Sequence, residues 1–265
     1  MMELTTAQRL ADLNRRFYEQ HAEAFADARP RLHPGVKRVL ASIPPGARVL
    51  ELGCGDGKVG RWLAANANVA SYLGMDSSAE MLERARRTPT PDPRLRAVGK
   101  FSDGRGESSP SFSLHPLSFI LTDLTSPDWP RALPSHPLDW ILAFAVFHHL
   151  PGFDARARIL RALADHLAPG GMFVISNWQF TRSERLKRRI VPWAALNLDE
   201  TEVEPGDYLL SWERGGQRGL RYVHVLDEAE ARRMAEAAGL AVIEVFRSDG
   251  VTGDLSDYVQ MRKSG

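Results

Sequence analysis

The chain has 265 residues, of which 43% are hydrophobic and 25% are charged. This length and composition predict one sizeable globular domain, with or without an elaboration, and exclude a disordered tail, a collagen-like fibre and a disulfide scaffold. The formal net charge is +1, so any surface for nucleic acid or membrane has to be local. With one cysteine and no apolar run long enough to span a membrane, the sequence favours a cytoplasmic protein without membrane contact.

Short apolar runs alternate with longer amphipathic stretches, which is typical of β and α units around a mainly parallel sheet. Strands are expected at residues 48–52, 70–75, 119–122, 140–143 and 172–177. Helices are expected between them at 58–65, 78–87 and 155–168, the last stopped by 169–171. A helix at 228–238 and strand-like runs at 241–246 and 258–262 give the sheet an antiparallel finish.

Three segments stand outside this alternation. Residues 1–35 are expected to form an N-terminal helical leader. Residues 88–116, rich in proline, serine and glycine, are expected to form a flexible insertion, and residues 181–226 a cap after strand five. The core is then 36–180, completed by a helix and the last two strands in 227–265.

The strongest chemical signal is a glycine-rich turn between the first strand and the next helix. It begins at Glu51 and contains Gly53, Gly55 and Gly57. Glycines at alternate positions let a backbone turn sharply and bring its amide groups close to a ligand. Together with Gly60, the turn also matches the fingerprint of dinucleotide-binding proteins.

Charge favours S-adenosylmethionine over a dinucleotide at this turn. A pyrophosphate would approach two carboxylates, Glu51 and Asp56, whereas a sulfonium and an ammonium group would be attracted to them. An ordinary structural turn is the alternative. Cys54, which lies between two of the glycines, is expected to be neither a nucleophile nor a metal ligand, and no metal site is expected.

Two more acids follow the next strands. Asp76 ends the second strand, where it can accept hydrogen bonds from ribose hydroxyls, and Asp123 follows the third, where it can accept one from an adenine amino group. Either acid alone could be an N-cap or turn residue. Because open α/β sheets bind ligands at the carboxyl ends of their strands, three acids at successive strand ends predict a cofactor site.

On these residues the chain resembles the class I S-adenosylmethionine-dependent methyltransferases. The resemblance covers residues 36–178 and includes the run 144–150 after strand four and 169–171 before strand five. It implies a Rossmann-like, seven-stranded α/β sheet with helices on both faces, and S-adenosyl-L-methionine as cofactor. The implied cofactor-binding residues are Tyr18, Glu51, Gly53, Gly55, Asp56, Asp76, Ser77, Asp123, Leu124 and Phe144.

Outside the core the chain is similar to the methyltransferases that esterify 5-carboxymethyluridine at the tRNA wobble position, including the methyltransferase domain of the AlkB-homologue fusion. The similarity rests on the runs 17–22, 29–31, 147–149, 206–208 and 221–224. The chain departs from the group where Leu32 and His33 replace a Pro-Trp pair and where Val223 replaces a tyrosine.

This second resemblance implies an in-line displacement by a carboxylate acceptor, which needs no strong general base. Arg29 and Arg221 are the candidates to hold the acceptor carboxylate, and His148 is the candidate to orient it. A surface salt bridge for Arg221 and strand-end packing for His148 are the alternatives. Aromatic side chains that could stack on a flipped base are Tyr18, Trp178, Trp193, Trp212 and Tyr222.

The acceptor stays open at this stage. A small-molecule O-, N- or C-methyltransferase would use the same core, and the near-neutral charge favours it. A non-catalytic S-adenosylmethionine-binding subunit is a third hypothesis, against which the intact acids argue. The expected partners are tRNA or a small-molecule acceptor and, as in some members of the resembled group, a small activating protein. The basic cluster between Arg182 and Arg189 would contact phosphate or form a solvated helix face.

Overall fold

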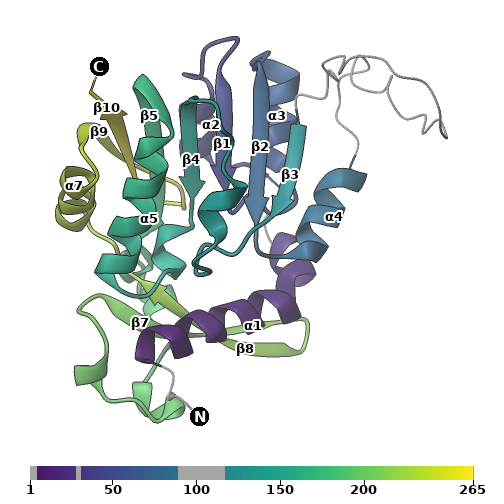
Figure 1. Cartoon of the computed structure of the whole chain (residues 1–265). Coiled ribbons are helices and arrows are strands. Elements are labelled where there is room, and N and C mark those ends of the chain that lie inside the picture. The colour runs from purple at the N-terminus through teal and green to yellow at the C-terminus, as the bar shows by residue number, and fades with distance from the viewer. Residues whose placement is uncertain (1–4, 28–30, 89–116, 265) are drawn as a thin grey trace.

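A computed structural model describes residues 5–27, 31–88 and 117–264 of the chain (Figure 1). Seven strands form one sheet in the order β3-β2-β1-β4-β5-β10-β9. Strands β1 to β5 run parallel, and β10 is antiparallel to both β5 and β9. Their bounds are β1 Arg48–Leu52, β2 Ser71–Asp76, β3 Leu117–Leu121, β4 Leu138–Phe144, β5 Leu167–Trp178, β9 Leu240–Ser248 and β10 Ser256–Lys263.

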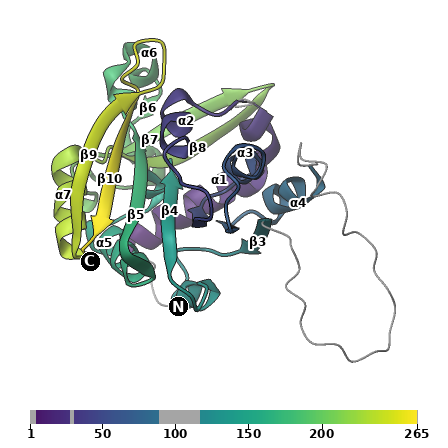
Figure 2. The same ribbon diagram turned by 90° about the horizontal axis from the view of Figure 1, so that it is seen from above.

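Helices cover both faces of this sheet, as Figure 2 shows from above. Helices α2 (Pro34–Leu40) and α3 (Lys58–Asn66) bury their apolar side chains on one face, and α5 (Phe153–Asp165) and α7 (Glu228–Ala237) on the other. Helix α4 (Ala79–Arg87) packs against β3 and β2. The predicted seven-stranded α/β sheet with helices on both faces is therefore confirmed. No described helix is long and apolar enough to cross a membrane.

Several predicted boundaries shift by one to three residues, and the one between α5 and β5 is wrong in kind. Helix α5 ends at Asp165, three residues earlier than expected, and residues 169–171 lie inside β5 rather than before it. The cause is a register shift in the pairing of β5 with β4, between Leu138 and Trp140, which absorbs the Pro-Gly-Gly turn within the strand. Gly170 makes this possible because it adopts a φ of 75°.

A second unit lies across the carboxyl edge of the parallel strands. It consists of helix α1 (Thr6–Asp27) and a three-stranded antiparallel sheet of β6 (Ile190–Val191), β7 (Asp207–Arg214) and β8 (Gln217–His224). Figure 1 shows α1 running alongside β8. Gly219 allows this close approach, because a Cβ atom there would lie 2.9 Å from the Phe17 ring.

Short helices complete the chain. They are η2 Trp129–Ala132, η3 Phe147–His149 after β4, η4 Phe180–Arg182, α6 Glu184–Lys187, η5 Trp193–Leu196 and η6 Glu200–Glu202. The expected flexible insertion, 88–116, lies outside the described residues except for its first residue.

Candidate functional site

The glycine-rich turn follows β1 and faces the loop after β4. Gly53 has a φ of 62°, and a Cβ atom there would lie 2.6 Å from Cγ2 of Val146, so only glycine fits. Gly55 has a φ of 53° and open space around its missing side chain. Its backbone is therefore accessible to a bound molecule. Gly60 has a different role, because its missing side chain makes room for the ring of Tyr72.

Glu51 lies buried beneath this turn, where it accepts a hydrogen bond from the hydroxyl of Tyr72. Burial, with a smaller contribution from the neighbouring Asp76 and Asp56, raises the pKa of Glu51 to about 8, against the opposing effect of the Tyr72 hydrogen bond. A carboxyl group held in this way favours a cationic ligand group, which would restore its charged form.

Asp76 ties the turn to the end of β2. Its Oδ2 accepts a hydrogen bond from the Gly55 amide at 2.8 Å, and its Oδ1 accepts one from the Ser78 amide at 2.9 Å. Burial still raises its pKa, despite these backbone hydrogen bonds. Ser77, between Asp76 and Ser78 in the sequence, is exposed at the same strand end. Asp76 therefore shapes the turn as well as facing a potential ligand.

The third acid also has a local role. Oδ1 of Asp123 accepts hydrogen bonds from the amide and hydroxyl of Thr125 at 2.8 and 2.7 Å, which is the turn geometry expected of a lone aspartate. Leu124 packs against the main hydrophobic core. Thr122, just before them, has a buried hydroxyl oxygen without a hydrogen-bond partner among the described residues. A bound molecule at the end of β3 would supply that partner.

Asp56 is neutralised by its own helix. Its carboxylate oxygens lie 3.4 Å from Nζ of Lys58 and 3.8 Å from a guanidinium nitrogen of Arg61. The electrostatic argument for a cationic ligand therefore depends on Glu51 and Asp76 rather than on Asp56. Phe144, at the end of β4, packs on the opposite core cluster to Leu124, with its ring 6.2 Å from that of Tyr258.

The structure brings Tyr18 of α1 together with η3 and β8. The Tyr18 hydroxyl oxygen is 2.8 Å from Nε2 of His149, whose Nδ1 is 3.4 Å from the carbonyl oxygen of Tyr222. Because a carbonyl only accepts, His149 carries its proton on Nδ1 and accepts the Tyr18 hydroxyl at Nε2. Arg221 donates from Nη1 to the same Tyr18 oxygen at 3.4 Å, and its guanidinium lies 5.0 Å from the Trp178 ring centre.

His148 is buried beside this group. Its Nδ1 accepts the backbone N–H of Trp178 at 3.4 Å, so the neutral ring carries its proton on Nε2. A ring in this tautomer donates a hydrogen bond and cannot serve as a general base at Nε2. Among the residues predicted to be catalytic, Arg221 and His148 are thus brought together, whereas Arg29 lies outside the described residues.

The aromatic set divides in two. Trp193 and Tyr222 pack in one small core cluster, and Trp212 packs on Phe17 with the ring centres 5.5 Å apart. These three side chains are almost completely buried by protein. Tyr18 and Trp178 are therefore the members of the set that remain candidates for stacking on a base.

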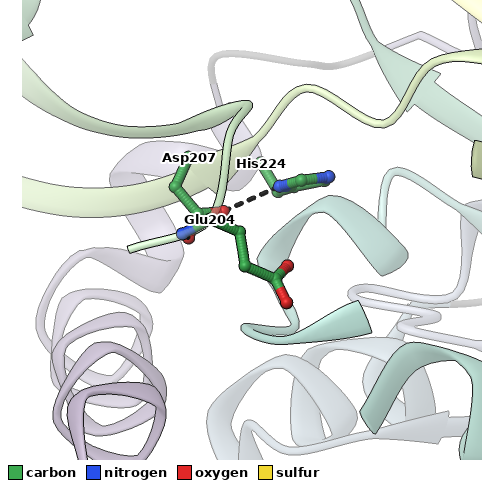
Figure 3. Close-up of side chains that lie close together, drawn as sticks. All are labelled: Glu204, Asp207 and His224. Atoms are coloured by element: carbon green, nitrogen blue, oxygen red, sulfur yellow. Dashed lines mark hydrogen bonds and ion pairs between the residues drawn. The ribbon is translucent and has the colours of Figure 1, made fainter. Parts of the chain in front are cut away.

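Figure 3 shows a cluster of the half-buried Glu204 and the buried Asp207 and His224, whose potential ligand atoms lie within 4.8 Å of one another. Protein groups already occupy these atoms. His224 lies 2.7 Å from Asp207 through Nδ1 and 2.7 Å from Glu230 through Nε2, and Arg156 donates to Glu204 at 2.8 Å. Burial lowers the pKa of His224, and the hydrogen bonds to these two carboxylates raise it overall. Because both ring nitrogens lie against carboxylate oxygens, the ring donates a hydrogen bond from each of them. The cluster thus anchors the β7–β8 hairpin to α5 and α7, and its cations oppose metal binding.

The single cysteine, Cys54, lies between glycines of the turn. Cys54 is buried, and burial raises the pKa of its thiol far above the usual range, with Glu51 and Asp76 adding to the effect. Its side chain fills the space beside Gly74, where a Cβ atom would lie 2.8 Å from the sulfur. A thiol held neutral is a poor nucleophile.

Comparison with known proteins identifies the family. Residues 23–245 match the model of a family described as a methyltransferase domain. The chain belongs to this methyltransferase family. It is 30% identical to a trans-aconitate 2-methyltransferase of Azoarcus over 67% of its length and 58% of the relative's. It is also 23% identical to a tRNA (carboxymethyluridine(34)-5-O)-methyltransferase of Schizosaccharomyces pombe, over 86% of the chain and 88% of that relative.

Solved structures agree on the fold. A S-adenosylmethionine-dependent methyltransferase of Methanosarcina mazei superposes with a TM-score of 0.59 at 19% identity, covering 88% of this chain and 98% of that one. The N-methyltransferase NodS of Bradyrhizobium japonicum with S-adenosyl-L-homocysteine gives 0.54 at 16% identity, over 88% and 86%. A complex of the Trm112 activator with a methyltransferase of Haloferax volcanii gives 0.56 at 17% identity, over 97% and 98%. This methyltransferase therefore has the class I fold that the sequence predicts.

Proposed function

We propose that this methyltransferase esterifies a carboxylate, and that the carboxylate belongs to a carboxymethyl-type uridine in tRNA. S-adenosylmethionine supplies an electrophilic methyl group on a sulfonium. The residues at the strand ends fit that cofactor, because Glu51 is poised for a cation, Gly55 leaves its backbone open and Thr122 has an unpartnered hydroxyl. We assign the cofactor contacts to Glu51, Gly53, Gly55, Asp76, Ser77, Asp123, Leu124 and Phe144.

The observation that carries the acceptor assignment is the position of Arg221. The side chain is buried, it donates to Tyr18, and it lies over Trp178 beside the two histidines of η3. A guanidinium presents paired N–H donors that match the two oxygens of a carboxylate. Arg221 is therefore placed to neutralise a carboxylate next to the end of β4.

The protonation state of His148 supports the same chemistry. With its proton on Nε2, His148 can donate to an acceptor oxygen but cannot remove a proton there. A carboxylate is already ionised at neutral pH, so its attack on a methyl group needs positioning and charge neutralisation rather than a base. His148 itself would therefore not act as the base for a hydroxyl or amine acceptor.

The relatives point to the same functional group. Both trans-aconitate and carboxymethyluridine carry a carboxylate, and these are the acceptors in the names of the two relatives described above. The tRNA enzyme matches this chain over nearly the whole length of both proteins, whereas the chain spans about half of the aconitate enzyme. We therefore place the tRNA acceptor first and a small carboxylic acid second.

A small activating protein is part of the proposal. Strand β3 is an edge strand, and it exposes 37% of Ile120 and 57% of Leu121. An exposed apolar edge of this kind favours a protein partner. The structural relative from Haloferax volcanii is bound to an activator.

We also retain a cytoplasmic location, which is a prediction from the sequence.

The test follows labelled methyl groups into two acceptor pools. Bulk tRNA is first treated with mild base, which converts existing methyl esters to carboxylates, and a small-molecule extract is assayed in parallel. We expect label in tRNA that mild base releases as methanol. Label that resists base would exclude a carboxylate acceptor, and base-labile label in the extract alone would move the assignment to a small acid.

Arg221→Ala completes the test. Loss of the buried cation should destabilise the transition state by about 2 to 4 kcal/mol, which is measured as a decrease in kcat/KM. The Kd of S-adenosylhomocysteine should stay within twofold. The matched control is Arg218→Ala, because Arg218 lies on the same strand but is exposed and pairs with Glu213. Normal turnover by the Arg221 variant would overturn the assigned role.

A further inference from the structure

Asn177, the second-to-last residue of β5, carries a side-chain amide that no described residue satisfies. The residue is 1% exposed, and both its nitrogen and its oxygen lack a hydrogen-bond partner in the described ranges. Buried polar atoms without partners are costly, and native proteins keep few of them. An amide with both ends unpaired therefore indicates a ligand or an ordered water molecule at this position.

The surroundings of Asn177 are those of the proposed acceptor site. The peptide that joins it to Trp178 donates its N–H to His148 of η3. By strand alternation the Asn177 side chain shares its face with Ile175, which packs in the same core cluster as Phe147 of η3. The amide therefore lies on the side of the sheet where η3 follows β4.

Strand order separates this position from the cofactor. The proposed contacts run from Asp123 at the end of β3, for adenine, through Asp76 at β2, for ribose, to Glu51 at β1. Strand β5 lies two strands beyond β1 on the side away from β3, a distance of about 10 Å. A ligand group at the end of β5 is thus past the methionine end of the cofactor, where the methyl acceptor has to lie.

We propose that the Asn177 amide binds the methyl acceptor through its adjacent N–H donor and C=O acceptor. Such a pair is complementary to an edge that also offers one N–H and one C=O, as the imide edge of a uracil ring does. The inference rests on the proposed function, in which the acceptor is a modified uridine. Arg221 then holds the carboxylate, and Asn177 holds the ring that carries it.

Two substitutions of the same kind test this assignment. Asn177→Leu removes both polar atoms at similar volume, and Thr122→Val removes another buried group that has no partner among the described residues, at the opposite end of the site. We measure KM for base-treated tRNA, kcat, and the Kd of S-adenosylhomocysteine by titration calorimetry. Asn177→Leu should raise KM for tRNA about tenfold and leave the Kd within twofold. Thr122→Val should weaken the binding of S-adenosylhomocysteine and leave the KM for tRNA unchanged.

A second variant guards against a packing effect. Asn177→Val also removes both polar atoms, in a smaller side chain that brings no charge into the buried position, so it should raise the KM for tRNA as Asn177→Leu does while its melting temperature stays close to that of the parent. An unchanged KM in both Asn177 variants, in an enzyme that methylates tRNA, would overturn the inference and assign the amide to water alone. A parent enzyme that transfers no methyl group to tRNA would instead overturn the proposed function, and with it the uracil edge.

Discussion

Tyr18 and His149 stand 131 positions apart in the sequence, yet the phenol oxygen lies 2.8 Å from Nε2 of the histidine. This hydrogen bond joins α1 to the η3 turn directly after β4. Asn14, one turn earlier in α1, makes two more links, to the carbonyl oxygens of His149 and Tyr222 at 3.2 and 3.0 Å. These bonds tie the N-terminal helix to η3 and β8, where we propose that the acceptor binds.

We predict that Tyr18→Phe lowers kcat more than it weakens cofactor binding. The missing hydroxyl would release both His149 and Arg221, at a cost of about 1 to 2 kcal/mol, which is roughly a five- to thirtyfold loss of rate. Steady-state kinetics and calorimetry with S-adenosylhomocysteine measure the two effects separately. Tyr208→Phe, on β7, is the matched control. Weaker cofactor binding with a normal kcat would show that Tyr18 contacts the cofactor, as the sequence resemblance implies.

A second prediction follows from the raised pKa of Glu51 and concerns how the affinity for the cofactor changes with pH. Below about pH 8 the buried carboxyl is protonated in the free enzyme, with Tyr72, Asp76, Asp56 and Lys58 around it. If an ammonium group binds the ionised form, binding releases a proton. Affinity should therefore rise with pH, by up to tenfold per unit from pH 6.5 to 8, and level off above.

Calorimetry in buffers of different ionisation enthalpy counts the released proton. Glu51→Gln should remove the pH dependence, whereas Asp139→Asn should preserve it, because Asp139 pairs with Arg48 at the opposite end of β1. An affinity that does not change over this pH range would show that Glu51 does not meet the cation.

Local patterning explains why the core was predictable and the acceptor side only in part. The parallel strands are short apolar runs with turn residues between them, so local sequence and final pairing agree. The β7–β8 hairpin was not foreseen, although Gly215 and Gly216 form a two-residue turn signal and both adopt positive φ. The side-chain amide of Asn177 lacks a hydrogen-bond partner among the described residues. This depends on which side chains the fold brings around it, and no local sequence pattern encodes that.

A third prediction concerns the contribution to stability of the ion pairs that Arg156 forms beneath the β7–β8 hairpin. Arg156 is 1% exposed and pairs with Glu230 and Glu204, and it also donates to the carbonyl oxygen of Leu150 after η3. Arg156→Met would leave Glu230 with His224 as its remaining partner and would take the Arg156 donor from Glu204, and breaking a buried ion-pair network in this way costs about 3 to 5 kcal/mol. Urea denaturation should show this decrease, while Arg232→Ala, which breaks an exposed helix pair, should stay within about 0.5 kcal/mol. Equal effects of the two substitutions would refute the anchoring role.

The last prediction separates the members of the basic cluster that follows β5. Arg182 is held by both oxygens of Asp257 on β10 at 2.6 Å, so its charge is already used within the protein. Arg185 and Arg188 are exposed on and after α6. Alanine at either exposed position should weaken tRNA binding and reduce the salt slope of log Kd by about one each, because each removes one phosphate contact. Arg182→Ala should lower the melting temperature and leave the salt slope unchanged. Binding curves at several salt concentrations decide the matter, and a reduced slope for Arg182→Ala would mean that the Asp257 pair opens to meet RNA.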